Sequence, residues 1–172
     1  MDLVCSDKIK QYFLDLDKEI KKTYTIAKNA RKKGLDPEKD VSIPLAKNMA
    51  QRVVGLISVV CPKIVETTVT QRIAELEKVY GQLDWRVGLT IAEEIAKEKF
   101  LKFETKQEAI EIGIRTGFAY LTLGIVSAPL EGFIGITIKK RKDGREYLAI
   151  KYAGPIRGAG GTAASTSVIL SD

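Results

Sequence analysis

The chain has 172 residues, 45% hydrophobic and 29% charged, a composition that suits one globular domain with a proper core and argues against disorder. Its formal net charge of +6 is compatible with a polyanionic partner, although a solvated surface explains this modest excess equally well. It contains no histidine, which excludes a histidine-based catalytic triad, a histidine-ligated metal site and a histidine pH switch.

The two cysteines, Cys5 and Cys61, lie too far apart in the sequence for the spacing of a metal site. The first residues lack the apolar segment of a secretory signal, and no apolar run reaches the roughly 18 residues that a membrane span requires. We therefore expect a cytoplasmic protein with reduced thiols and no membrane partner. Few Asn and Gln residues beside many Lys, Glu and Arg are typical of a thermophilic source.

Apolar residues at helical spacing predict a first helix over residues 6–33. The pattern begins at Ile9 and Phe13, and Gly34 ends it. The later turns are rich in cations, and we take four of them as candidate DNA-binding residues: Lys28, Arg31, Lys32 and Lys33. Cations also complement the dipole at a helix C-terminus, so a purely structural role explains them equally well.

A turn-rich connector, residues 35–44, follows the first helix, and Asp36 is a candidate N-cap within it. Pro62 is expected to separate two of the next helices, and Gly81 to close the second of them. The predicted helices are residues 45–60, 64–80 and 86–100.

The sequence TKQE at residues 105–108 has the form of a capping box and begins another helix. From Ile110 to Val126 this helix is apolar on nearly every side, so we expect it to be buried at the centre of the fold. Its charged pair is Glu111 and Arg115, one helical turn apart.

Gly113 and Gly117 form a Gly-x-x-x-Gly motif in the same helix. Such a motif permits a neighbouring helix to approach closely. The uncharged run after Arg115 is too short to span a membrane, so we interpret the motif as a contact within a globular fold or with a partner protein.

After Pro129, apolar residues alternate with small or polar ones in two stretches, which predicts two strands flanking the sequence KKRKDGR. The parity of the alternation favours a three-residue loop, residues 142–144, with Gly144 in the left-handed conformation. In this register three pairs are expected to face each other: Ile138 with Leu148, Ile136 with Ile150, and Ile134 with Tyr152.

The tip of this hairpin displays five cations and one acid, Asp143. We take the cations as candidates for binding a nucleic-acid backbone: Lys139, Lys140, Arg141, Lys142 and Arg145. Because the tip lacks Asn, Gln and exposed aromatic residues, we expect contacts to phosphates without readout of sequence or base stacking. Edge strands also carry lysines that prevent aggregation, which is the alternative explanation.

The stretch YAGPIRGAGGTAAS, residues 152–165, places glycines between a strand and a helix that begins near Thr162. Free amides at a helix N-terminus favour an anion, so the stretch is a candidate phosphate or domain-junction loop formed by Arg157, Gly158, Gly160, Gly161 and Thr162. It matches neither the P-loop nor the dinucleotide fingerprint, and a tight turn packed under small residues explains it at least as well. The helix has no stop signal before Asp172, so we expect the chain to be part of a longer protein.

No pair of Asp or Glu residues has the spacing of a metal or acid–base site. We therefore predict that the chain has no catalytic residue, no metal and no cofactor of its own.

YAGPIRGAGGTAAS, together with the earlier EAIEIGIRTGFAYLTLGIVSAPLEG and IAEEIAKEKF, resembles the N-terminal region of the large subunit of the archaeal family D DNA polymerases. The resemblance covers most of the chain, including ARKKGLDPEKDVSIPLAKNMAQRV, and is most specific at residues 153–163. Gly158 stands where that pattern has Ser, which removes any hydroxyl-mediated contact at this position.

The resemblance implies a replicative polymerase of the archaeal cytoplasm, a heterodimer with a small subunit that carries the proofreading exonuclease. It also implies Mg ions and deoxynucleotides for the full-length polymerase, whose metal-binding carboxylates would lie beyond Asp172. The chain would then be an accessory domain that contacts DNA, the small subunit and the remainder of the large subunit, and a homodimer is an open alternative.

The predicted fold is α+β and mainly α, a multi-helix domain with a β-hairpin near the C-terminal end. Its expected segments are a basic amphipathic helix (1–34), a connector (35–44), a helical core (45–128), and a last segment with the hairpin, the glycine-rich turn and a truncated helix (129–172). The main alternative function is a protein–protein assembly or dimerisation module whose basic charge is incidental. A small phosphate-binding enzyme is a weaker alternative.

Overall fold

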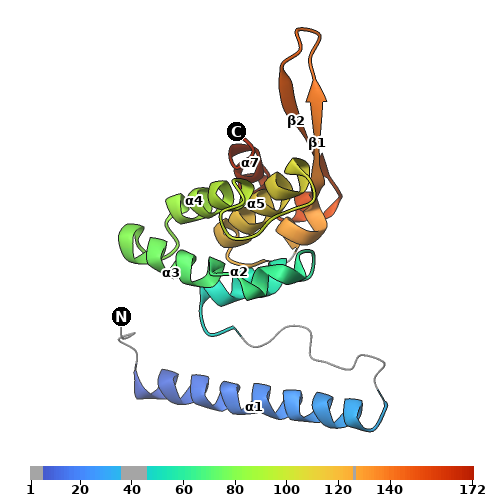
Figure 1. Ribbon diagram of the computed structural model, residues 1–172. Helices are drawn as coiled ribbons and strands as arrows, with labels where there is room; N and C mark the ends of the chain where they lie inside the picture. Colours follow the sequence, from blue (N-terminus) through green and yellow to red (C-terminus); the bar gives the residue numbers. More distant parts are fainter. Residues whose placement is uncertain (1–5, 36–45, 126) are drawn as a thin grey trace. The chain divides into compact units, whose positions relative to one another are not determined.

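The computed structural model describes residues 6–35, 46–125 and 127–172, and it divides into two compact units, Met1–Pro44 and Leu45–Asp172 (Figure 1). The fold is mainly helical, with one two-stranded antiparallel hairpin near the C-terminal end, which confirms the predicted fold class. Within the described ranges, no helix is long and apolar enough to cross a membrane.

The first unit contains a single described helix, α1 (Asp7–Lys32), which confirms the predicted first helix to within a residue at each end. Ser6 is its N-cap, and the Ser6 hydroxyl accepts a hydrogen bond from the Ile9 amide. Gly34 follows the helix in the left-handed conformation, with φ of 69°. The predicted N-cap role of Asp36 lies outside the described residues.

The second unit is built on four helices, α2 (Met49–Ile57), α3 (Val69–Tyr80), α4 (Trp85–Ala96) and α5 (Lys106–Leu121). Each is shorter than the helix predicted from the sequence. The predicted helix over residues 64–80 is in fact two elements, because Pro62 opens a 3₁₀ turn, η1 (Pro62–Glu66). Thr67 then adopts an extended conformation, and its hydroxyl donates to the Ile64 carbonyl 2.7 Å away, which ends the turn before α3 begins.

Helix α5 is the buried centre of this unit, as its all-round apolar sequence predicts, with ten of its sixteen residues buried. The Thr105 hydroxyl caps it by accepting from the Glu108 amide at 3.1 Å. The Glu108 carboxylate accepts from the amide of Glu104 rather than from that of Thr105, so the capping box is displaced by one residue. The helix ends at Leu121, five residues earlier than predicted, because Leu123 and Gly124 are both left-handed.

The Gly-x-x-x-Gly motif of α5 lies against α4, which confirms that it permits a close helix contact. A Cβ atom at Gly113 would lie 2.5 Å from the Ala92 carbonyl oxygen, and one at Gly117 would lie 2.6 Å from the Gly88 carbonyl oxygen. Neither distance is compatible with a side chain, so both glycines are required for this packing.

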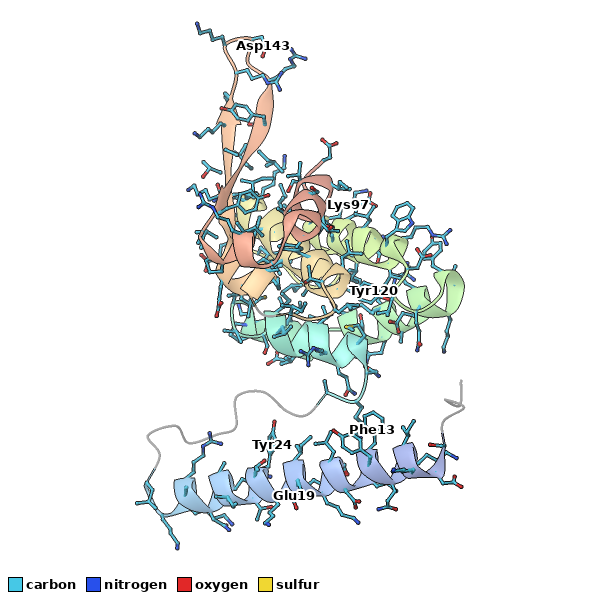
Figure 2. All side chains as sticks on the ribbon, turned by 180° about the vertical axis from the view of Figure 1, so that it is seen from behind. Phe13, Glu19, Tyr24, Lys97, Tyr120 and Asp143 are labelled. Carbon is cyan, nitrogen blue, oxygen red and sulfur yellow. The ribbon has the colours of Figure 1, made fainter. Side chains whose placement is uncertain are left out.

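Two hydrogen-bonded groups tie α3 to its neighbours. The Tyr120 hydroxyl of α5 donates to Glu77 at 2.9 Å and accepts from the Leu83 amide at 2.9 Å, which holds the turn between α3 and α4 (Figure 2). Glu94 of α4 accepts two hydrogen bonds from the Arg72 guanidinium, each 2.9 Å long. Together these contacts hold α3 against α4 and α5.

The hydrophobic core has two parts, one on each side of α5. The first part lies among α2, α3, α4 and α5. The second joins Ile114 and Phe118 of α5 to the base of the hairpin, where Phe133 and Ile136 are buried. This division explains why α5 is apolar on nearly every side.

The hairpin consists of β1 (Phe133–Lys140) and β2 (Glu146–Tyr152) and extends away from the helices in Figure 1. Ile136 faces Ile150 and Ile138 faces Leu148, which confirms two of the three predicted pairs. Gly144 has φ of 85°, and the Arg141 amide donates to the Arg145 carbonyl across the predicted three-residue loop.

The third predicted pair is wrong, because a β-bulge shifts the register at the start of β1. Phe133, not Ile134, faces Tyr152, and Ile134 is left half exposed. The bulge places the Phe133 ring in the core, and Gly135 accommodates it with φ of 151° beside the Glu111 carboxylate.

The glycine-rich stretch forms two short helices, α6 (Pro155–Gly158) and α7 (Gly161–Ile169). The start of α7 confirms the predicted helix near Thr162 to within a residue. The one-turn helix α6 is not foreseen from the sequence. α7 ends at Ile169, and Leu170 is its C-cap.

Candidate nucleic-acid interface

Arg115, a buried residue of α5, makes the hydrogen bonds that join this helix to the start of the hairpin. Its guanidinium donates hydrogen bonds of 2.7 Å to the carbonyl oxygens of Pro129, Phe133 and Ile134. It also forms an ion pair with Glu111 at 2.9 Å and lies 4.9 Å from the centre of the Phe133 ring. Pro129 precedes β1, and Phe133 and Ile134 are its first two residues. Arg115 therefore helps to determine where the hairpin leaves the helices.

The register assigns every hairpin side chain to one of two faces, because successive residues of a strand point in opposite directions. One face carries Ile136, Ile138, Leu148 and Ile150, the first of which is buried in the core. We call the opposite one the outer face. In the strands it consists of Thr137, Lys139, Tyr147, Ala149 and Lys151. We extend it to Arg141 and Arg145, which flank the loop just beyond the strands and are hydrogen-bonded to each other.

The five cations predicted at the tip are divided by these faces. Lys139, Arg141 and Arg145 lie together on the outer face, whereas Lys140 lies on the other face and pairs across the hairpin with Glu146. Lys142 belongs to the loop. The structure thus gathers three of the five predicted cations and adds Lys151, which was not predicted from the sequence.

Arg145 is the one outer-face cation with an ion-pair partner in the described part of the chain. Its guanidinium contacts Asp143 at 2.7 Å and 2.9 Å, and its amide donates to the same carboxylate at 3.1 Å. These hydrogen bonds from Arg145 hold the pKa of Asp143 below its ordinary value. Figure 2 shows Asp143 at the far end of the hairpin, so Arg145 and its partner form the end of the ribbon.

Tyr147 is an exposed aromatic residue at the centre of the outer face. It is 40% exposed, it faces Lys139 across the hairpin, and the Arg141 guanidinium lies 5.8 Å from the centre of its ring. The predicted tip, residues 139–145, contains no aromatic residue, but Tyr147 lies beside it on the outer face. The predicted register already contained the signal, since a strand with Leu148 facing inward must direct Tyr147 outward.

The second predicted set of cations is at the end of α1. Lys28, Arg31 and Lys32 belong to its last turns, and Lys33 is its C-cap. Earlier lysines of α1 pair with acids, such as Lys18 with Asp15. The sequence has no acid between residues 20 and 35, so the end of the helix carries a local excess of positive charge. This set and the hairpin belong to different units.

The candidate phosphate loop is divided between α6 and α7. Arg157 and Gly158 belong to α6, Gly160 is the N-cap of α7 with φ of 92°, and Gly161 and Thr162 begin α7. The Gly160 amide donates to the Arg157 carbonyl at 3.3 Å. A Cβ atom at Gly158 or Gly161 would meet nothing within 4 Å, so packing among the described residues does not explain these two glycines.

Among the residues that the structure describes, no group of three or more His, Cys, Asp or Glu side chains could hold a metal ion. Cys61 is buried, and its burial raises the pKa of the thiol.

The sequence comparisons agree with the resemblance. A family model described as the N-terminal region of the DNA polymerase II large subunit DP2 matches residues 11–172. The chain is 49% identical over 161 residues to the DNA polymerase II large subunit of Nanoarchaeum equitans, covering 94% of this chain and 13% of that protein.

Two further relatives have the same name. The chain is 47% identical over 166 residues to the subunit of Pyrococcus furiosus, covering 95% of this chain and 12% of that protein. It is 42% identical over 171 residues to the subunit of Methanococcoides burtonii, covering 99% of this chain and 14% of that protein. The chain therefore spans only a small part of the length of the relatives that it matches.

Proposed function

The chain belongs to the family of the N-terminal region of the archaeal DNA polymerase II large subunit, and on that premise we propose that it is an accessory DNA-binding domain of such a subunit. The outer face of the hairpin contacts the phosphate backbone of DNA in this proposal. The contacts hold the DNA in place and do not read its sequence.

The observation that carries the proposal is the sorting of charge on the hairpin. Four cations share the outer face, while the acid Glu146 lies on the other face with Lys140. In the described part of the chain, Lys139, Arg141 and Lys151 have no acid within ion-pair distance. Such cations are available to replace the counterions of a phosphate backbone, which is the main source of nonspecific affinity for DNA.

We assign nucleotidyl transfer to parts of the large subunit outside this chain. The full-length subunit would use Mg ions and deoxynucleotides, and a small subunit would supply the exonuclease. The present chain would contribute no catalytic group, because nucleotidyl transfer requires acidic residues that bind two metal ions.

A charge-reversal experiment tests the DNA-binding role. Affinity of the 172-residue chain for a labelled duplex is measured by fluorescence anisotropy at low salt. Lys139→Glu combined with Arg141→Glu should weaken binding at least about tenfold, because two phosphate contacts become repulsions. Lys140→Glu is the matched control on the other face and should have a much smaller effect. Equal losses of affinity in the two variants would contradict a role of the outer face.

A second candidate function, subunit assembly, is favoured by α1. Within its own unit none of its described residues is buried, and Tyr12, Phe13 and Leu16 expose large apolar side chains. An uncovered apolar side is typical of a helix that packs against a partner protein. Light scattering of the chain with and without the small subunit tests this. A complex that Phe13→Glu abolishes supports assembly, and a monomer under both conditions contradicts it.

A further inference from the structure

We propose that the outer face of the hairpin prefers single-stranded DNA to duplex DNA, because an unpaired base stacks on Tyr147 while the surrounding cations hold the backbone. This inference rests on the proposed DNA-binding function and names its substrate class. It does not follow from the charges alone, since cations without an aromatic surface bind either form of DNA through its phosphates.

The position of Tyr147 is the first argument. Its nearest outer-face neighbours are cations: Lys139 faces it across the hairpin, and Arg141 lies diagonally opposite with its guanidinium 5.8 Å from the centre of the Tyr147 ring. Arg145 lies two residues before Tyr147, beside the loop and just ahead of β2. An aromatic ring surrounded by cations is the arrangement with which proteins bind single strands, because the ring stacks with a base and the cations contact the flanking phosphates.

The contrast with the other tyrosine of β2 is the second argument. Tyr152 has a structural role, since its hydroxyl is 2.6 Å from the Ser167 hydroxyl and its ring contacts Phe133 edge to face. Tyr147 belongs to neither part of the hydrophobic core of the described residues. Its one ring contact there is with Arg141, an exposed side chain, so the fold does not require an aromatic residue at this position.

The available ring surface is the third argument. Tyr147 is 40% exposed on a ribbon that extends away from the helices (Figure 1), so a base can reach it without displacing the core. Arginine also stacks on nucleobases, so Arg141, whose guanidinium lies over the Tyr147 ring, is a second group on which a base can stack. A base within a duplex has both faces covered by its neighbours, and only an unpaired base can use this surface.

The test compares a single-stranded oligonucleotide with a blunt duplex of the same length, bound to the 172-residue chain at one salt concentration. Tyr147→Leu retains an apolar side chain that suits a strand but removes the aromatic face, and it should weaken single-strand binding about tenfold. The same variant should change duplex binding less than about twofold. Tyr147→Phe keeps the ring and should bind both forms as the unchanged chain does.

A second probe needs no variant. An oligonucleotide in which abasic sites replace several bases keeps every phosphate, so the unchanged chain should bind it about as weakly as the Tyr147→Leu variant binds the normal strand. Equal affinity for the abasic and normal strands would overturn the inference even if Tyr147→Leu fails to fold. Stronger binding of duplex than of single strand would overturn it too and leave the backbone-binding function intact. Absence of binding to either form would instead reject the proposed function itself.

Discussion

Arg115 is the residue on which the position of the candidate interface depends. It is buried, it carries a charge, and it donates to three carbonyl groups that lead into the hairpin. A buried charge of this kind is stable only while all its partners are in place. The sequence indicates its pairing with Glu111 but not its carbonyl partners, which come from residues 14 to 19 positions away along the chain.

Replacing Arg115 tests this dependence. Arg115→Met should lower the free energy of unfolding by about 3 kcal/mol, because Glu111 and the three carbonyls lose their partner. DNA affinity should fall as well, although no outer-face residue changes. Urea unfolding and anisotropy measure the two effects. Arg86→Met, which removes an exposed guanidinium paired with Asp84, is the control and should change stability by less than about 1 kcal/mol.

Because of Glu94, the free energy of unfolding should decrease at acid pH. Hydrogen bonds from Arg72 hold the pKa of this nearly buried carboxyl below its ordinary value of 4.5. A lowered pKa in the folded state contributes stability above pH 4.5, and this contribution disappears as the pH falls through the folded-state pKa. Glu94→Gln should therefore be less stable at neutral pH and should lose less stability on acidification. Urea unfolding at several pH values measures this, and parallel pH profiles for the two chains would contradict it.

At the scale of elements, α5 organises the second unit because it packs on both sides. Its apolar sequence and its Gly-x-x-x-Gly motif predict burial and a close helix contact, and both are confirmed. The hairpin register is also predictable, since it follows from alternation within a few residues. The bulge at Ile134 is not, because it depends on the fit of Phe133 into the core and on Arg115, which are contacts between distant residues.

The close contact between α4 and α5 predicts that glycines of this chain differ sharply in the stability lost when a side chain is added. Gly117→Ala should destabilise the chain by about 1 to 3 kcal/mol, because the added Cβ atom would overlap the Gly88 carbonyl. Gly158→Ala is the control and should be nearly neutral, since it is exposed and has open space around it. Thermal unfolding followed by circular dichroism measures both, and similar melting temperatures for the two variants would contradict this packing.

At the scale of the whole molecule, a net charge of +6 does not identify a binding surface, because the fold determines where the charges lie. The sequence identifies the basic segments, because cations adjacent in the chain remain close in a hairpin. The run of cations by itself does not single out Tyr147 or Lys151, since neither belongs to it. Those two residues become candidates only when the register assigns them to the outer face.

The chain alone should incorporate no nucleotides. The described residues contain no acidic cluster suited to two metal ions, which nucleotidyl transfer requires. Primer extension with Mg²⁺ and deoxynucleotides, on protein freed of contaminating polymerase, measures this. Extension that persists through purification and depends on the metal would contradict the assignment of catalysis to other parts of the subunit.

The most direct test of the central claim is the salt dependence of DNA affinity. We compare the unchanged chain with a variant in which Lys139, Arg141 and Lys151 are all replaced by Gln, using two duplexes of unrelated sequence. The account predicts that the slope of log affinity against log salt becomes shallower by up to ~0.9 for each phosphate that the variant no longer neutralises, and equally for both duplexes. An unchanged slope in a variant whose circular dichroism is intact would show that the outer face does not bind the DNA backbone.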